Sequence, residues 1–118
     1  MHYYQHSIAD FDKNTKISKL PLVYVLSCPN LEYIKIGMTT SPKQRFSNVQ
    51  SGCPFKLFLW LGIRTPTPKK VERALHEKFK IFRTRGEWFK IDSDAADLIV
   101  DFFAKTNADV RNKRDALL

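Results

Sequence analysis

The sequence predicts an α+β fold: a small, mostly antiparallel three-stranded sheet flanked by helices. Two β-rich runs, residues 22–27 and 33–39, are separated by a few turn-forming residues, which is typical of a hairpin. Farther along, segments with helical apolar spacing alternate with more β-rich pieces, so strands and helices must share one core. The expected order of elements is β-β-α-β-α-β-α.

The first part of this fold is the hairpin and one helix. Residues 27–30, Ser-Cys-Pro-Asn, supply the turn between the two strands. Thr40 or Ser41 can cap a helix that starts near Pro42 and runs to about Gln50, where a Ser-Gly pair follows.

The middle of the chain predicts a third strand and a second helix. Residues 55–63 are almost continuously apolar, which favours a central strand covered on both faces. Prolines and threonines at 65–68 then lead into a helix with one buried stripe, formed by Val71, Leu75 and Phe79.

The last part begins after a basic turn that ends at Gly86. Residues 88–91 form a short strand-like piece, and Asp92 or Ser93 can cap a final helix. The inward-facing side chains of that helix should be Leu98, Ile99, Phe102 and Phe103.

Length and composition limit the classes of protein. With 118 residues, 43% of them hydrophobic, there is room for one domain with a modest core. We expect an N-terminal arm at 1–20 with a short helix around 7–12, the domain at 21–104, and a polar C-terminal tail at 105–118. No apolar run approaches the roughly 18–20 residues that span a membrane, and no signal-peptide pattern opens the chain. An intracellular, cytoplasmic protein of bacterial or phage origin is expected.

The cysteines and the charges narrow the choice further. Cys28 and Cys53 lack metal-site spacing, so free thiols in a reducing compartment are expected. The net charge of +8 is concentrated in residues 64–90, which carry nine Lys and Arg against three acidic residues. A basic block within a folded domain suggests a polyanionic partner, although a solvated lysine-rich face is the ordinary alternative.

Two residues of the hairpin have a use in phosphodiester hydrolysis, which needs a base for the attacking water and positive charge at the phosphorane. Tyr24 could act as the base only if nearby cations stabilise its phenolate, because a phenol has a pKa of about 10. Lys35, on the partner strand, could supply such a charge. The alternatives are a packed aromatic ring and a solvated lysine.

Gly37 and Arg45 come next in the chain. A glycine at this point of a strand permits a bulge or a close approach of the backbone. Arg45 falls at the border of the apolar stripe of its helix, where a guanidinium can point into a cleft and bind two phosphate oxygens. An exposed helix arginine is the alternative.

Glu72 is an acidic residue on a basic helix, and His76 lies one turn farther on the same face. A carboxylate together with water and substrate phosphate can hold Mg²⁺ or Mn²⁺, so Glu72 is a candidate ligand for a single divalent cation. It could instead pair with a neighbouring Lys or Arg. A zinc site would need two further ligands.

In order and spacing, these residues resemble the GIY-YIG nuclease superfamily, in the branch named for the bacteriophage T5 Orf172 domain and related to a meiotically up-regulated gene family of yeast (gene 113-like). The resemblance covers residues 22–91. The matching motifs are Val-Tyr-Val-Leu at 23–26, Lys-Ile-Gly-Met-Thr at 35–39, Arg45, Glu-x-x-Leu-His at 72–76 with Phe79, and Gly-Glu-Trp-Phe at 86–89.

The resemblance implies a role for several residues. The first motif tyrosine acts at the attacking water, the helix arginine contacts the phosphate and the helix glutamate binds one divalent metal, so these roles fall to Tyr24, Arg45 and Glu72. Lys35 stands in place of the second motif tyrosine, and residues 22–24 read Leu-Val-Tyr instead of Gly-Ile-Tyr. The asparagine that often completes the set is not evident, and the Glu-Trp-Phe sequence lies in its region.

Other residues of the motifs have more than one interpretation. His76 either orients Glu72 or a phosphate, or packs its ring beneath Trp88. Trp88 and Phe89 belong to the core or form a platform for stacked bases. Candidates for contacts to DNA are the basic residues Lys43, Lys69, Lys70, Arg73, Arg83 and Arg85.

Three functions fit these residues. The presence of Tyr24, Arg45 and Glu72 favours a divalent-metal-dependent DNA endonuclease. A DNA-binding module that does not cleave, or a protein-interaction domain, could use the same fold. Double-stranded DNA is the expected partner, and a protein partner could supply specificity because little is attached to the domain. The sequence does not indicate an oligomeric state.

Overall fold

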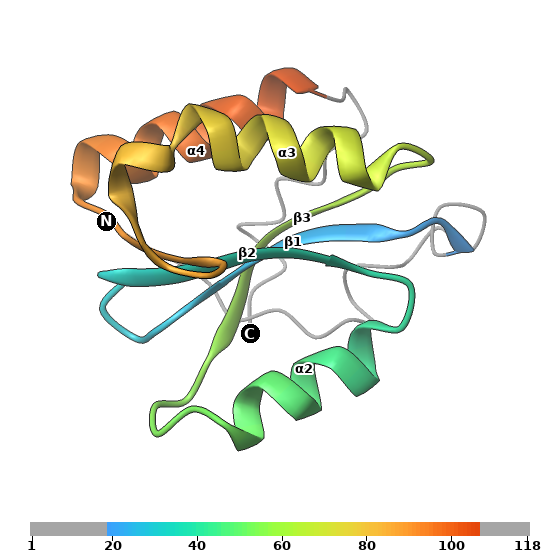
Figure 1. The fold of residues 1–118 in the computed structure, drawn as a ribbon, viewed down its shortest axis with the longest axis horizontal. Coiled ribbons are helices and arrows are strands. Elements are labelled where there is room, and N and C mark those ends of the chain that lie inside the picture. Colours follow the sequence, from blue (N-terminus) through green and yellow to red (C-terminus); the bar gives the residue numbers. More distant parts are fainter. Residues whose placement is uncertain (1–18, 107–118) are drawn as a thin grey trace.

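The predicted hairpin lies inside an antiparallel sheet in the computed structural model, which describes residues 19–106 (Figure 1). Strands β1 (Leu22–Ser27) and β2 (Tyr33–Thr39) pair along their whole length. The order of strands across the sheet is β3-β1-β2-β5-β4. The α+β class and the hairpin are therefore confirmed.

The sheet has five strands, so the predicted number of three is wrong. β3 (Phe58–Arg64) pairs with β1 and β5 (Trp88–Lys90) pairs with β2, while β4 (Arg83–Arg85) forms the far edge. β4 occupies the segment expected to be a basic turn, and Gly86, with φ of 57°, connects it to β5. β3 lies at an edge of the sheet and not in its centre, so the expected central position is wrong. The apolar run correctly predicted that β3 is buried, but such a run does not determine the order of strands.

Helices cover both faces of the sheet (Figure 1). α2 (Pro42–Ser51) lies on one face, where it contributes Phe46 to a cluster with residues of β1 and β3. α3 (Pro68–Lys78) and α4 (Ser93–Thr106) lie together on the other face, and a short 3₁₀ turn (Lys80–Phe82) follows α3. The predicted helix starts, near Pro42 and after the prolines and threonines at 65–68, are confirmed.

Alternation along β1 separates the two cores. Val23 and Val25 point to the large core under α3 and α4, whereas Leu22 and Tyr24 point to the smaller one under α2. Tyr24 is completely buried. The side chain of the candidate catalytic tyrosine is therefore held on the α2 face of the sheet.

The inner face of α4 differs in part from the prediction. Ile99 and Phe103 are buried, but Leu98 is 51% exposed and Phe102 is only partly covered. Two small residues, Ala95 and Ala96, occupy the remaining inner positions. The buried stripe of α4 consists of Ala95, Ala96, Ile99 and Phe103, spaced by three and four residues. With this stripe facing the core, Leu98 points towards solvent.

The remaining expectations concern the two ends of the chain, a membrane span and the cysteines. The arm up to residue 18, with its expected helix at 7–12, and the tail from residue 107 lie outside the described residues. Within residues 19–106 no helix is long and apolar enough to cross a membrane. Cys28 and Cys53 are free thiols.

The cap of α4 provides a test of the fold. The Asp92 carboxylate accepts a hydrogen bond from the Ala95 N–H at 2.8 Å. Asp92→Ala should lower the free energy of unfolding by about 1 kcal/mol, measured by urea denaturation, because a helix N–H loses its acceptor. Asp97→Ala, an exposed change in the body of the same helix, should have little effect. Equal losses in the two variants would contradict the capping role.

Candidate active site

The candidate site lies where β2 continues beyond its pairing with β5. β5 pairs with β2 only as far as Lys35, after which the Ile36 N–H donates to the Glu87 carbonyl at 3.0 Å. The Ile36 carbonyl, on the same edge, lies 3.0 Å from Nε2 of His76 on α3. A helix side chain thus takes the place of a strand partner, and this brings α3 and Glu72 to the edge of β2.

Tyr24 and Gly37 are opposite each other on β1 and β2. The phenol lies so close to the backbone of β2 that a Cβ on Gly37 would be 2.5 Å from Tyr24 Oη and 2.8 Å from Cζ. Any side chain at this position would displace the ring. Gly37 therefore makes room for Tyr24, and β2 keeps a regular register there without a bulge.

Arg45 is positioned by its neighbour on α2. The Phe46 ring packs edge-on against Tyr24, with 5.1 Å between ring centroids. Arg45, the preceding residue, is exposed and acts electrostatically on both Tyr24 and Glu72. Helical spacing puts Lys43 on the opposite flank of the apolar stripe, away from this cleft.

Lys35 has two partners, neither of them a tyrosine. Its ammonium lies 3.2 Å from Glu87 Oε1 and 5.4 Å from the centroid of the Trp88 ring. Glu87 Oε1 would also lie 3.0 Å from a Cβ on Gly37, so this carboxylate stands beside the Tyr24 phenol. Glu87 is a residue of the site for which the sequence predicted no role. Its place in the region of the missing asparagine was the one signal that could have identified it.

The Tyr24 hydroxyl is buried and has no hydrogen-bond partner among the described residues. Burial, and next the nearby charge of Glu87, raises the pKa of Tyr24 to about 12, with Arg45 acting in the opposite direction. The nearby cations therefore do not lower the pKa of the phenol below its ordinary value. At neutral pH the group is a proton donor without an acceptor.

Glu72 is the second group of the site whose pKa departs from its ordinary value. Burial and then the neighbouring Glu87 raise its pKa, against the opposing effects of His76, Arg45 and Lys35. A bound cation would favour the ionised forms of two neighbouring carboxylates, Glu72 and Glu87. Within residues 19–106 no three His, Cys, Asp or Glu side chains form a metal-binding group. Carboxylate oxygens are ligands of hard cations such as Mg²⁺ or Mn²⁺, which keep much of their water, so the chemistry of Glu72 and Glu87 fits such an ion.

His76 fits neither sequence interpretation fully. Its ring packs edge-on against Phe89 at 5.1 Å and not beneath Trp88, while its Nε2 contacts the Ile36 carbonyl. Its charge still acts on Glu72, but its hydrogen bond joins α3 to β2. Phe89 is completely buried in the core, whereas Trp88 is only half-buried.

The other predicted basic residues are not gathered in one place. Arg83 and Arg85 are exposed on β4, and the Arg83 Nε–H donates to the Gly86 carbonyl at 2.6 Å. Lys70 faces a groove between α3 and α4, on the flank of α3 away from Glu72. Two exposed residues of α3 lie nearer the Glu72 flank by helical spacing, Lys69 and Arg73.

Comparison with known families identifies one family model. The family model of the T5orf172 domain matches residues 22–104, a range that includes every residue of the cleft. This family is related to the GIY-YIG nucleases. Curated proteins and solved structures give no match.

Gly37→Ala tests the contact between Tyr24 and β2. The new methyl group would collide with the phenol, so the free energy of unfolding should fall by about 1–3 kcal/mol in urea denaturation. Gly52→Ala is the matched control, because a Cβ there meets only the Val49 carbonyl at 3.8 Å. Similar losses in the two variants would show that the close contact at Gly37 has no special importance.

Glu72→Gln tests the charge balance of the cleft. A raised carboxyl pKa means that ionisation of Glu72 costs folding free energy, so the glutamine variant should be more stable at neutral pH in metal-free buffer. The gain should be about 0.5 kcal/mol, since solvent screens the partly exposed group. It should vanish as the pH falls far enough to protonate Glu72 in both the folded and unfolded chain. A loss of stability at neutral pH would contradict the assignment.

Proposed function

The chain belongs to the T5orf172 family, and from the cleft of its domain we propose that it is a divalent-metal-dependent endonuclease that hydrolyses phosphodiester bonds of DNA. The observation that supports the proposal is the proximity of Arg45 and Glu72 to Tyr24, whose pKa both affect, together with a buried Tyr24 hydroxyl that has no hydrogen-bond partner among residues 19–106. Double-stranded DNA is the substrate of this proposal, with residues 21–104 as the catalytic domain and specificity supplied by a protein partner.

Arg45 and Lys35 are the groups that bind the scissile phosphate. The exposed guanidinium of Arg45 can donate two parallel hydrogen bonds to non-bridging oxygens. Lys35 is more enclosed, with its side chain 15% exposed, and its charge is most effective there because water screens it less. Both charges stabilise the additional negative charge of the phosphorane.

Tyr24 serves as a hydrogen-bond donor in this mechanism. Its phenol, with a pKa of about 12, keeps its proton and can donate to the attacking water or to a phosphate oxygen. A hydrogen bond to an oxygen that gains charge strengthens in the transition state, so the contact contributes to rate and not only to binding. The substrate would provide the acceptor that the hydroxyl lacks.

Glu72, with Glu87 beside it, would hold the divalent cation. When bound, Mg²⁺ or Mn²⁺ supplies positive charge that makes water a better nucleophile and stabilises the departing oxygen. The two carboxylates must be ionised to bind it, and the raised pKa of Glu72 makes this a condition on pH. His76 holds Glu72 in place by fixing α3 to the Ile36 carbonyl.

A DNA-binding module that does not cleave is the second candidate. The ion pair between Lys35 and Glu87 favours it, because part of the positive charge near the phosphate is already neutralised. In that case Arg45 and the exposed cations would bind the DNA backbone without a chemical step. The two candidates differ in cleavage and agree in salt-dependent binding.

Cleavage of a supercoiled plasmid in Mg²⁺ or Mn²⁺ tests the proposal. Glu72→Gln and Arg45→Ala should each lower the rate by about 100-fold or more. The first weakens binding of the cation, and the second removes positive charge that stabilises the phosphorane. Lys105→Ala, at an exposed position of α4, is the control and should keep near-normal cleavage. Cleavage that survives both site variants would indicate a contaminating nuclease, and binding without any cleavage would favour the second candidate.

The pH dependence of cleavage should depend on Glu87. Activity should fall as the pH drops through the pKa of Glu72, because a protonated carboxyl cannot bind the cation. Since Glu87 helps to raise that pKa, Glu87→Gln should move the acidic limb of the pH–rate profile to lower pH. An unchanged or oppositely shifted limb would contradict the coupling. Glu77→Gln, on the exposed side of α3, is the charge-matched control.

A further inference from the structure

A pocket of about 820 Å³ lies next to the candidate active site and has no role in the mechanism above. The pocket is lined by Tyr33 of β2, Trp88 of β5 and Arg85 of β4. Tyr33 and Trp88 lie on the α2 face of the sheet, together with Lys35, by alternation and by the pairing of β2 with β5. Because the Lys35 ammonium lies over the Trp88 ring, the pocket is close to the proposed phosphate site.

Three aromatic rings and the guanidinium of Arg85 line this pocket, and two lysines lie close to the rings. Tyr33 is 41% exposed and Phe55 is 61% exposed, while Trp88 is half-buried. The Lys35 ammonium lies 5.4 Å from the centroid of the Trp88 ring, and the Lys90 ammonium lies 5.8 Å from that of Tyr33. Such a combination of ring faces and positive charge suits flat, electron-rich rings that are attached to an anionic backbone.

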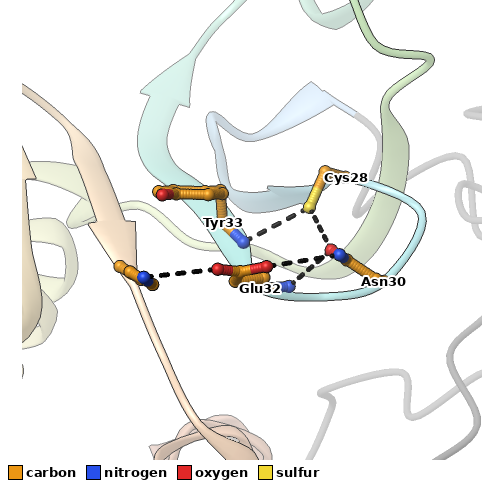
Figure 2. A network of polar contacts seen from close by, with 5 residues as sticks. Cys28, Asn30, Glu32 and Tyr33 are labelled. Carbon is orange, nitrogen blue, oxygen red and sulfur yellow. Dashed lines mark hydrogen bonds and ion pairs between the residues drawn. The ribbon is translucent and has the colours of Figure 1, made fainter.

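The wall formed by the β1–β2 turn is fixed in place (Figure 2). The Asn30 side-chain oxygen accepts hydrogen bonds from the Cys28 thiol at 2.9 Å and from the Glu32 N–H at 3.0 Å. The Tyr33 N–H donates to the Cys28 sulfur at 3.3 Å. On the other side Glu32 forms an ion pair with Lys90 at 3.3 Å. These contacts hold the turn before any ligand arrives.

The opposite wall is fixed by a single side chain of α2. Gln50 donates a hydrogen bond to the Phe55 carbonyl and accepts one from the Leu57 N–H, each at 2.8 Å. The loop between α2 and β3, including Cys53 and Phe55, is thereby attached to the helix that carries Arg45. A pocket with both walls held by side-chain hydrogen bonds loses little conformational freedom when it binds a ligand.

From these features we propose that the pocket receives an unstacked nucleobase of the DNA strand whose phosphate is bound at Arg45 and Lys35. The inference rests on the proposed function, because it takes the position of the strand from the cleft. The volume lies within the range of about 300–1,000 Å³ that is typical of sites for small organic groups. Arg85, exposed at the rim, is placed to contact the backbone of the same strand.

Positive charge close to the rings argues for a nucleic-acid base over an apolar peptide. Lys35 and Lys90 each lie over a ring of the pocket and pair with Glu87 and Glu32, while the exposed Arg85 adds a positive charge to the lining itself. A base brings phosphates that attract the exposed cations, whereas an apolar peptide side chain brings no charge to balance them. In the enzyme, such a base would leave the stack near the cleavage point, which gives the pocket a role in placing the strand.

The test compares two ligands that differ only in their bases. An oligothymidylate and an abasic phosphodiester strand of the same length are titrated at low salt, without divalent metal, into Glu72→Gln protein. Fluorescence anisotropy reports both affinities. The oligothymidylate should bind about tenfold or more tightly than the abasic strand, because stacking on aromatic side chains adds to the shared phosphate contacts.

Variants locate the preference in the pocket. Phe55→Ala and Trp88→Ala should each bring the two affinities close together and leave the salt dependence unchanged, while Trp88→Phe should retain much of the preference. Leu98→Ala removes an exposed apolar residue of α4 and should behave like the parent. Phe55 is so exposed that its variant tests the pocket even if Trp88→Ala does not fold.

The outcomes separate this inference from the proposed function. Equal affinity for the two strands, or a preference that persists in the Phe55 and Trp88 variants, overturns the base pocket and leaves cleavage open. A base preference that depends on the pocket in a protein that never cleaves supports the pocket and refutes the endonuclease. No binding of either strand overturns the base pocket and leaves cleavage of double-stranded DNA to the plasmid assay.

Discussion

The contact between the Tyr24 phenol and the backbone of Gly37 is the constraint on which the rest of the site depends. It requires β1 and β2 to pair in one register, because a shift by one residue would turn Tyr24 to the other face of the sheet. It also gives Phe46 a surface to pack on, which places Arg45 beside the phenol. On the edge of β2, the bond from His76 to the Ile36 carbonyl brings Glu72 to the same point. Arg45 of α2 and Glu72 of α3, from helices on opposite faces of the sheet, thus both lie close enough to affect Tyr24.

The negative charges of the site lower the stability of the folded chain at neutral pH. Glu72 and Glu87 repel each other and both oppose ionisation of Tyr24, so burial and charge raise the pKa values of Glu72 and Tyr24. The ion pair of Glu87 with Lys35 relieves only part of this. A purely structural cluster would gain stability by replacing Glu72 with a neutral residue. Under the proposed function, a hydrated cation and a phosphate would supply the positive charge and the hydrogen-bond acceptors that this cluster lacks.

Local patterns in the sequence were enough for the hairpin, for α2 and α3, and for the cap of α4. They were not enough for the order of the strands, because the apolar run of β3 is equally consistent with a centre or an edge. β4 contains only exposed polar residues and becomes a strand through its pairing with β5. Glu87 and the contact of His76 with Ile36 depend on residues far apart in the chain, and such contacts leave no periodic signal. The motifs named Tyr24, Lys35, Arg45 and Glu72 as candidates, and the positions of these side chains relative to one another came from the fold.

Glu72 and Glu87 are proposed to hold one divalent cation beside Tyr24, and NMR with Mn²⁺ tests this arrangement. A paramagnetic ion broadens the signals of nuclei near its binding site. Added in substoichiometric amounts, Mn²⁺ should broaden first the backbone amides of Gly37, Glu72 and Glu87, and Glu72→Gln should abolish this pattern. Broadening centred instead on the exposed acidic residues of α4, Asp94, Asp97 and Asp101, with the amide of Gly37 unaffected, would contradict the account.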